Sequence, residues 1–585
     1  MGDTIKLFMW GYQQHFHHSL QYEAENLFNR IDKNLKPKVF LLGFLVEERE
    51  DRHKICLEPE DCGYNIDSFS NLEKLAEELE KVDSKGKIWH SHPIAQENHK
   101  KRIGNKALID SIKKILERED LYGDTEKYIS HPTYVDGFLV FTVVEIQNAA
   151  ISKHYSLTKE KFDNLFKISR SFIESTIDSY LKECSIALKD PNRGLQAIEK
   201  QAEEVLRESG KQFMYTISQS GGNFNGLHGL YDACNTIASM KYEGAEGIGK
   251  LAIANKEHIN LRLTLELEEP IKVNDYRKVR KFLELSTEDS IIISDSYQIY
   301  GLGELVGKYN PKDESLFVIN FISHFKWEVL HDNNSMMVVE YRLPNISKDK
   351  IDRVKFYSDF PRIFKNIKKR QIDKLWDITM QATQQKHGTM LVISSNAEKE
   401  SDRLGKQCFA IKPMKLTTNI TQQITSIDGA VLLNQDSTCF AIGVILDGVA
   451  TEKGDSSRGS RYNSAVRYYE YFGKETSIII VIISEDGIIN LIPELRPQIK
   501  HSEITDRIEN LRELNKLEKV EKKKYYPIIK WFENNQFYLR ENECLEINEL
   551  RKEIELKENK NESAGISIVR NDLKSNKEMN DSYYK

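Results

Sequence analysis

The chain has 585 residues, more than a single hydrophobic core usually holds, so we expect several domains. Hydrophobic residues make up 39% and charged residues 30%, which is typical of globular domains with a charged surface. The net charge of −6 predicts no nucleic-acid partner, and the apolar runs are shorter than the ~20 residues that cross a membrane. Seven scattered cysteines without a CxxC pair favour a reducing compartment, so we expect the protein to lie in the cytoplasm. The patterns described below predict a multidomain α/β fold.

Residues 1–210 are predicted to form a mixed α/β domain. An apolar run predicts a buried strand at Val39–Val46. Apolar residues at helical spacing predict one helix that starts after Asn105, a residue type that suits an N-cap, and a second helix over 162–177.

Residues 211–365 are predicted to form a second α/β domain, richer in strands. Glycines cluster between 221 and 249, and short β-like runs follow them. The predicted strands are Ile259–Leu267, Ser290–Ile293, Leu316–Phe321 and Met336–Tyr341.

Residues 366–500 show the clearest alternation of helix and strand, and they predict a mixed β-sheet flanked by helices. The predicted elements are a helix over 372–384, strands over 389–394, 429–433 and 439–446, a helix over 461–471 and a strand over 477–483. Residues 501–585 are predicted to form a charged helical tail, and its last ~25 residues have the low hydrophobicity typical of disorder.

Two segments of the third domain carry residue types that bind phosphate. Asp428-Gly429-Ala430 stands where a strand begins, and Arg458-Gly459-Ser460-Arg461 stands where a helix begins. A helix N-terminus offers N–H groups and partial positive charge, to which Ser460 adds a hydroxyl and the arginines add guanidinium groups. A turn before a strand and a capped helix are also common structural features, and this alternative stays open.

Two carboxylates of the same domain are candidate ligands for a hard cation. Asp428 lies at a strand edge, and Glu485 follows the strand predicted over 477–483. The position of Asp428 suits a hard cation or a hydroxyl to be deprotonated, and Glu485 would complete a two-carboxylate site for such a cation.

Four motifs of this domain together resemble the diadenylate cyclase (DAC) domain, the DisA-type nucleotide-binding domain. They are His387–Ile393, Ser426–Val431, Gly459–Ala465 and Ser484-Glu485. That family carries an HG strand start, a DGA motif, a G-[TS]-R-H-R-A-A motif and an SEE-like acidic turn in this order. The resemblance covers less than a quarter of the chain, and it implies that the domains before it sense or regulate.

The resemblance implies a nucleotidyltransferase that converts two ATP molecules to cyclic di-AMP and pyrophosphate with Mg²⁺ or Mn²⁺. Two DAC domains would face each other in a homodimer or higher homo-oligomer. Asp428 and Arg461 would be catalytic, and Asp428 and Glu485 would bind the metal. The nucleotide would contact Gly429, Ala430, Arg458, Gly459, Ser460 and Arg461.

One motif departs from the family pattern, because R-H-R reads here Arg461-Tyr462-Asn463. Two donors to a triphosphate are therefore absent, and Arg458 is a candidate replacement. This departure leaves an alternative open, in which the protein is a nucleotide or cyclic-dinucleotide sensor without turnover. A third reading is a scaffold with a vestigial site.

Four weaker motifs are better explained as structural. Trp89-His90-Ser91-His92-Pro93 resembles the core of JAMM-type zinc peptidases, but Lys100 stands at the serine position. Gly244–Lys250 fits the phosphate-loop pattern GxxxxGK, but Leu251 replaces its Ser or Thr. Gly221–Gly229 is typical of turns, and Lys519–Lys524 is typical of a solvated helix.

Overall fold

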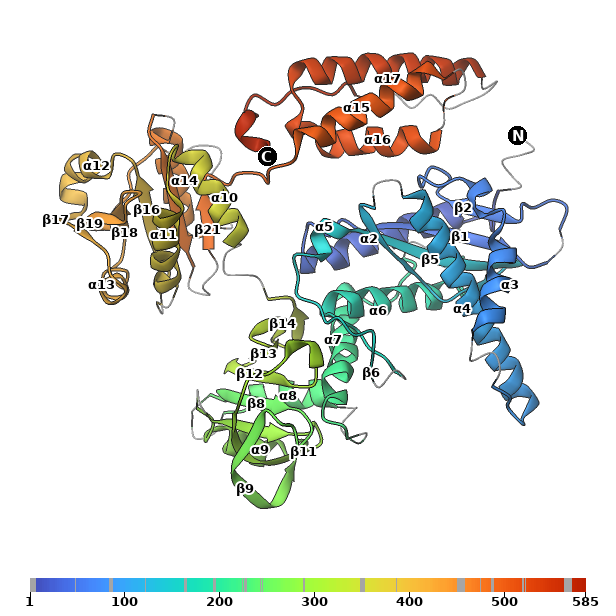
Figure 1. Ribbon diagram of the computed structural model, residues 1–585, viewed down its shortest axis with the longest axis horizontal. Helices are drawn as coiled ribbons and strands as arrows, with labels where there is room; N and C mark the ends of the chain where they lie inside the picture. Colours follow the sequence, from blue (N-terminus) through green and yellow to red (C-terminus); the bar gives the residue numbers. More distant parts are fainter. Residues whose placement is uncertain are drawn as a thin grey trace. The chain divides into compact units, whose positions relative to one another are not determined.

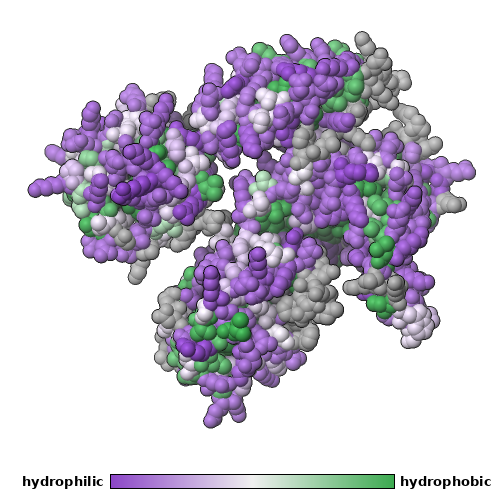
Figure 2. Space-filling view, in the orientation of Figure 1, coloured by the Kyte–Doolittle hydropathy of each residue, from purple (hydrophilic) through white to green (hydrophobic). Residues whose placement is uncertain are grey.

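The computed structural model divides the chain into two compact units, Met1–Ser347 and Lys348–Lys585 (Figure 1). It describes residues 7–585 except 48, 84–87, 121–122, 163–165, 193–195, 224, 226–228, 242–243, 245, 288–289, 348–352, 384, 386, 450–457, 474, 485–488, 518–519, 521 and 562–570. Hydrophilic side chains cover most of the face in view in Figure 2, as the charged composition predicts. None of the helices described here is long and apolar enough to cross a membrane.

The first unit begins with an antiparallel sheet in the order β2-β1-β5-β3, with β4 paired to β5. Side chains alternate between its two faces. Val39 of β1 packs in the cluster that includes α2, whereas Phe40 packs in the cluster that includes α3 and α4. The strands are β1 (Lys38–Leu45), β2 (Ile55–Glu58), β3 (Thr125–Ile129), β4 (Thr133–Val135) and β5 (Phe138–Gln147).

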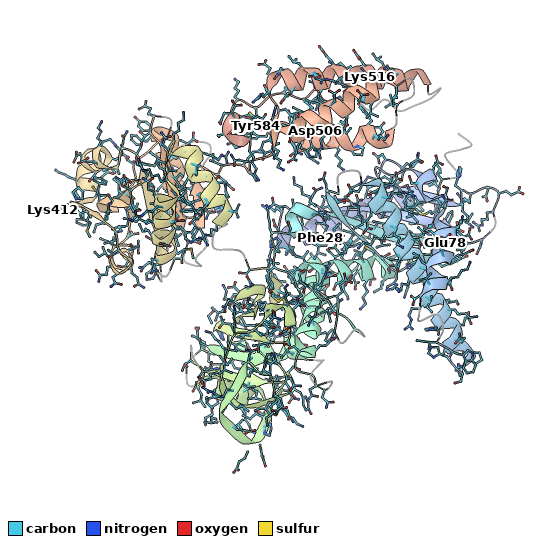
Figure 3. All side chains as sticks on the ribbon, in the orientation of Figure 1. Phe28, Glu78, Lys412, Asp506, Lys516 and Tyr584 are labelled. Atoms are coloured by element: carbon cyan, nitrogen blue, oxygen red, sulfur yellow. The ribbon has the colours of Figure 1, made fainter. Side chains whose placement is uncertain are left out.

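Helices cover both faces of this sheet, and further helices of the first unit follow them in the chain (Figure 1). They are α2 (Gln13–Ile31), η1 (Ile66–Phe69), α3 (Leu72–Val82), α4 (Pro93–Glu119), α5 (Asn148–Ile151), α6 (Phe172–Ala187), α7 (Ala202–Gln219) and α8 (Leu230–Ser239). Phe28 of α2 is buried in this layer (Figure 3).

Two predicted helix starts are wrong. Asn105 lies inside α4, which begins twelve residues earlier because Pro93 at its first position needs no N–H partner. The helix predicted over 162–177 begins only at Phe172, after Ser171 accepts a hydrogen bond from the Glu174 N–H as its N-cap. Before it, Lys161–Phe162 (β6) pairs with Phe166–Lys167 (β7).

The second sheet of the first unit has the order β15-β14-β13-β12-β8-β10-β11-β9. Gly249 opens β8, so the GxxxxGK pattern leads into a strand and is not a phosphate loop. The elements are β8 (Gly249–Ile253), β9 (Leu261–Lys272), α9 (Tyr276–Leu283), β10 (Ile291–Ser294), β11 (Gln298–Leu305), η4 (Pro311–Asp313), β12 (Phe317–Ser323), β13 (Lys326–His331), β14 (Asn334–Glu340) and β15 (Leu343–Asn345).

The second unit is built on a mixed sheet in the order β17-β19-β18-β16-β20-β21, in which β16 and β18 are parallel. Leu391 of β16 packs under α10 and α11, and Val392 packs on the other face under α12 and α14. The strands are β16 (Thr389–Ser394), β17 (Phe409–Lys415), β18 (Ala430–Leu433), β19 (Thr438–Val444), β20 (Ile478–Ile483) and β21 (Ile489–Ile492). The helices are α10 (Arg353–Ile363), α11 (Lys369–Ala382), α12 (Ala397–Leu404), η5 (Gly405–Gln407), α13 (Thr418–Ile424) and α14 (Ser460–Phe472).

The predicted sheet flanked by helices is confirmed. Every helix and strand predicted between 366 and 500 is present within a few residues of its expected bounds, whereas β17, β21, the helices α12 and α13 and the short η5 were not predicted. β17 is an edge strand whose side chains are nearly all exposed, and Figure 3 shows Lys412 at this outer edge.

The helical tail is confirmed, and it consists of α15 (His501–Lys516), α16 (Lys522–Asn534), η6 (Gln536–Tyr538), α17 (Glu541–Asn561) and η7 (Asp581–Tyr583). The prediction of disorder at its end is wrong for residues 571–585. Leu573 and Tyr583 are buried in the core of the tail, and the Tyr584 hydroxyl (Figure 3) donates to the Tyr538 carbonyl at 2.6 Å. A few apolar anchors outweigh the polar average of this segment.

Candidate functional site

Gly429 lies just before β18, where the chain passes very close to the end of the neighbouring strand β19. Its φ is +105°, and a Cβ there would lie 2.7 Å from the Gly443 carbonyl carbon and 3.0 Å from the Val444 nitrogen. Only glycine fits this position without strain. The turn leaves the Asp428 side chain 94% exposed, while Ala430 is fully buried and begins β18.

The N-terminus of α14 provides backbone donors. Gly459 is its N-cap and Ser460 its first residue, and Gly459 has no side chain that could cap the first N–H groups. Ser460 is exposed at this end. No side chain among the described residues caps this helix end, which therefore has the partial positive charge and the backbone N–H groups that favour an anion.

Arg461 connects these two segments. Its Nη2 lies 3.4 Å from Oδ1 of Asp428, so residues 33 apart in sequence meet at one place. Arg461 is 35% exposed, and an exposed pair at this distance adds little to stability. Both side chains can therefore exchange this contact for a ligand at small cost.

Arg458 is held by contacts that the sequence did not predict. Its Nη1 donates to Oδ1 of Asn490 in β21 at 3.3 Å, and its guanidinium carbon lies 4.8 Å from the centre of the Tyr462 ring. The Asn463 amide donates to the Arg458 carbonyl at 3.0 Å and to the Gly459 carbonyl at 3.3 Å. Of these contacts, the sequence could have indicated only the one between Arg458 and Tyr462, because they are four residues apart at a helix start.

A second network of polar contacts lies just after β19. Arg403 of α12 binds both oxygens of Asp447, at 2.6 and 2.7 Å, and also bonds to Glu400, which accepts from the Tyr468 hydroxyl of α14 at 2.8 Å. The hydrogen bonds from Arg403 lower the pKa of Asp447. This network ties α12 and α14 to the chain just after β19.

The predicted metal site can be tested only in part, because Glu485 lies outside the described residues. The residues that the structure does describe contain no cluster of three or more His, Cys, Asp or Glu side chains suited to a metal ion. Of the two predicted ligands, Asp428 is the one that the structure describes, and its carboxylate is exposed. This donor set fits Mg²⁺ or Mn²⁺, because such ions are commonly held by one or two carboxylates together with the phosphates of a substrate.

The histidines near Trp89 do not form such a cluster either, as far as the described residues show. The His90 and His99 rings are 4.8 Å apart, and His99 Nδ1 lies 3.0 Å from Nη2 of Arg102. These contacts favour the structural interpretation of the motif.

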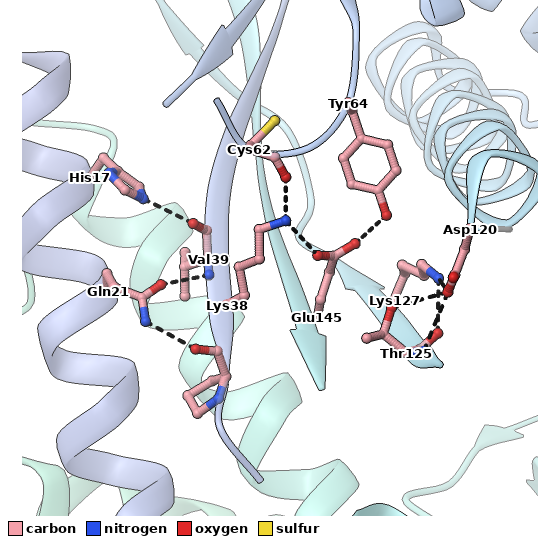
Figure 4. Close-up of polar contacts among 11 residues, drawn as sticks. His17, Gln21, Lys38, Val39, Cys62, Tyr64, Asp120, Thr125, Lys127 and Glu145 are labelled. Carbon is pink, nitrogen blue, oxygen red and sulfur yellow. Dashed lines mark hydrogen bonds and ion pairs between the residues drawn. The ribbon is translucent and has the colours of Figure 1, made fainter. Parts of the chain in front are cut away.

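The first unit also holds a buried polar network, which is drawn in Figure 4. Glu145 of β5 lies 3.1 Å from the Lys38 ammonium of β1 and accepts a hydrogen bond from the Tyr64 hydroxyl. Next to Glu145 in the sheet, Lys127 bonds to Asp120. These groups join strands and loops across the sheet and satisfy one another.

Three family models match successive segments of the chain. Residues 9–214 match the model described as "Probable sensor domain DACNG", and residues 228–333 match "Probable sensor domain DACNH". Residues 378–495 match the DAC model, described as "DisA bacterial checkpoint controller nucleotide-binding". The resemblance to the DAC family is thereby confirmed, as is the presence of sensor domains before it.

Solved structures are similar to part of the chain. A double mutant of DacA from Staphylococcus aureus is 18% identical and covers 21% of this chain and 80% of its own, with a TM-score of 0.18. A hypothetical membrane spanning protein from Bacillus cereus is also 18% identical and covers 23% of this chain and 68% of its own, with a TM-score of 0.18. No curated protein matches the chain.

Proposed function

We propose that this chain, which matches the DAC model behind two probable sensor domains, is a diadenylate cyclase that converts two ATP molecules to one cyclic di-AMP and two pyrophosphates. The 3′-hydroxyl of each ATP attacks the α-phosphate of the other. Each attack forms one P–O bond at the α-phosphate and breaks the bond between the α- and β-phosphates. The β- and γ-phosphates leave as pyrophosphate, and the proton of the hydroxyl is released to solvent. The sensor domains would control this reaction.

The contact between Asp428 and Arg461 is the observation that carries this proposal. It brings the exposed carboxylate of the DGA motif to the N-terminus of α14, 3.4 Å from a guanidinium. The carboxylate can orient a hydroxyl for attack. The guanidinium and the backbone N–H groups beside it can bind the phosphate chain that the hydroxyl attacks.

The chain's own residues divide the work between binding and orientation. The first N–H groups of α14, the Ser460 hydroxyl and the guanidinium groups of Arg458 and Arg461 bind the phosphates. Gly429 lets the nucleotide approach the backbone at the sheet edge. Asp428 accepts the hydrogen bond of the 3′-hydroxyl and so orients it for attack.

A divalent ion, Mg²⁺ or Mn²⁺, would be held by Asp428 and Glu485, and it would screen the phosphate charge when bound. ATP should therefore bind much more weakly without such an ion. Titration calorimetry with and without Mg²⁺ measures this difference, and equal affinities would contradict the proposed roles of both carboxylates.

Two DAC domains must meet for turnover, because each holds one of the two ATP molecules. We therefore expect a homodimer or higher homo-oligomer whose specific activity rises with protein concentration until it saturates. A monomer in light scattering that forms cyclic product at constant specific activity would contradict this assembly.

The second candidate is a nucleotide or cyclic-dinucleotide sensor without turnover. Tyr462 and Asn463 favour it, because they stand where the family motif has two further donors. Purified protein incubated with ATP and Mn²⁺ decides between the two functions when its products are identified by mass spectrometry. Cyclic di-AMP supports the cyclase, whereas calorimetric binding of ATP or cyclic di-AMP without product supports the sensor.

A further inference from the structure

Arg458 is an exposed arginine with an unusual number of restraints. It precedes the N-cap of α14, where an exposed side chain of this length ordinarily samples many rotamers. Its guanidinium lies over the Tyr462 ring at 4.8 Å, and its Nη1 also bonds to Asn490 at 3.3 Å. The side chain is thus held both by the helix that follows it and by the edge strand β21.

The backbone of the same residue is held from a third side. The Asn463 amide donates to the carbonyls of Arg458 and Gly459, at 3.0 and 3.3 Å. Tyr462 and Asn463 are consecutive residues in the first turn of α14. One restrains the side chain of Arg458, and the other restrains its main chain.

The contact with Tyr462 leaves the binding capacity of Arg458 available. A cation–π contact uses the face of the guanidinium, whereas its N–H donors lie along the edge. One of these donors bonds to Asn490, and other N–H groups along the planar edge can donate to a phosphate group. A pre-ordered arginine binds an anion more tightly than a mobile one, because less conformational freedom is lost on binding.

We propose that Tyr462 is a positioning residue, which holds the Arg458 guanidinium beside the N-terminus of α14 so that it binds the triphosphate of the nucleotide. The inference rests on the proposed function for the identity of the anion. It assigns a use to Tyr462 and Asn463, the two residues that depart from the family motif. The departure then moves a phosphate-binding guanidinium to a neighbouring position and does not simply remove one.

Inorganic tripolyphosphate is the probe that separates this inference from catalysis, and its affinity is measured by titration calorimetry. Arg458→Ala should weaken binding about tenfold, as the loss of one charge-assisted contact predicts. Tyr462→Leu should weaken it about threefold to fivefold, because the arginine remains but is no longer ordered. Tyr462→Phe keeps the aromatic face and should stay within about twofold of the parent.

The double variant Arg458→Ala/Tyr462→Leu gives the decisive comparison. If Tyr462 acts through Arg458, the double variant should bind no more weakly than Arg458→Ala alone. Full additivity, or a Tyr462→Leu variant that binds like the parent, would overturn the inference. Arg540→Ala is the matched control, since Arg540 also lies over a tyrosine ring, Tyr584 at 5.1 Å, but belongs to the helical tail.

Two further measurements keep the outcomes distinct. Thermal unfolding of each variant checks the fold. If Tyr462→Leu is destabilised, Tyr462→Phe still tests whether the ring without its hydroxyl is sufficient, and binding by Tyr462→Phe as weak as by Arg458→Ala would overturn the inference. A parent protein that binds tripolyphosphate with this pattern but makes no cyclic product would sink the proposed catalysis and leave the positioning role standing. A parent that binds neither tripolyphosphate nor ATP would overturn both.

Discussion

The polar network of the first unit and the candidate site of the second unit use charge in opposite ways. Glu145 is 5% exposed and bonds to both Lys38 and Tyr64 (Figure 4), whereas Asp428 is 94% exposed and lies 3.4 Å from Arg461. The first carboxylate is surrounded by partners, and the second is open to solvent.

This difference separates a structural charge from a functional one. A buried carboxylate is tolerated only when its hydrogen-bonding capacity is filled, so removing a partner affects folding. Burial, followed by the nearby Glu145 charge, raises the pKa of Tyr64 far above its ordinary value, so Tyr64 stays protonated and donates. An exposed carboxylate near a helix N-terminus costs little to keep open, so removing it should affect binding and catalysis.

The largest expected effect is on activity, from Asp428→Asn. The variant keeps the size of the side chain but loses the charge that would orient the hydroxyl and hold the ion, so turnover should fall about a thousandfold. The melting temperature of the second unit should not change, because the pair with Arg461 is exposed. Mass spectrometry of the products checks the turnover, and calorimetric melting checks the stability. A variant with near-parental turnover would contradict a functional role for this exposed carboxylate.

The next effect is on stability, from Glu145→Gln in the first unit. This change leaves the Lys38 ammonium without its buried counter-charge, and it should cost about 3 kcal/mol of unfolding free energy. Urea unfolding measures the loss. Glu97→Gln is the matched control, because Glu97 pairs with Lys101 on the exposed surface of the same unit at 2.9 Å, and it should unfold like the parent. Equal losses in both variants would show that burial does not distinguish the pairs.

A smaller effect on stability tests whether the backbone at the candidate site requires glycine at position 429. Gly429→Ala places a methyl group against the Gly443 carbonyl carbon at a positive φ and should cost about 2 kcal/mol of stability. Gly459→Ala is the control, because its φ is −65° and nothing lies within 4 Å of the added Cβ. Differential scanning calorimetry should therefore separate the two variants, and similar melting temperatures would contradict the close approach of the strands.

Sequence patterns predicted the second unit well where burial and local turns agree. The strand Thr389–Ser394 has the predicted bounds, because a continuous apolar run can only be buried. β17 was missed because its sequence, FAIKPMK, has a proline and an exposed edge position, both of which weaken a strand signal. The pairing of β17 with β19 in the folded sheet, and not the local sequence, makes these residues a strand.

The sequence predicted the residues of the candidate site that belong to its motifs, but not the contacts that they make with residues outside the motifs. The resemblance of the DGA motif and the helix start to the DAC family implied that Asp428 and Arg461 would serve one site, and they lie 3.4 Å apart. The bond from Arg458 to Asn490 could not be predicted, since it joins a loop to an edge strand whose place depends on the closing of the whole sheet. The role proposed for Glu485 stays a prediction.

The smallest effect tests the buried polar groups of the first unit through pH. His331 is fully buried; its Nδ1 lies 2.6 Å from the Tyr155 hydroxyl, and its Nε2 lies 3.1 Å from the Tyr309 hydroxyl. Burial lowers the pKa of His331, although the carboxylates of Glu314 and Asp332 oppose this shift.

The sign of the effect follows from proton binding. Below pH 6.5 the unfolded chain takes up a proton at this position that the folded protein binds less readily, so stability should fall as the pH drops. The loss due to His331 should be at most about 1.4 kcal/mol per pH unit, and it should be absent above pH 7.5.

Urea unfolding at pH 7.5, 6.5 and 5.5 measures this slope, and His331→Gln should flatten it. The glutamine cannot titrate, yet it can still bond to the two tyrosine hydroxyls. His53→Gln, at an exposed histidine, controls for the loss of a histidine as such. Parallel slopes for the parent and His331→Gln would mean that the histidine titrates alike in the folded and unfolded chains. The contrast between buried and exposed charge would then not extend to the junction of His331 with Tyr155 and Tyr309.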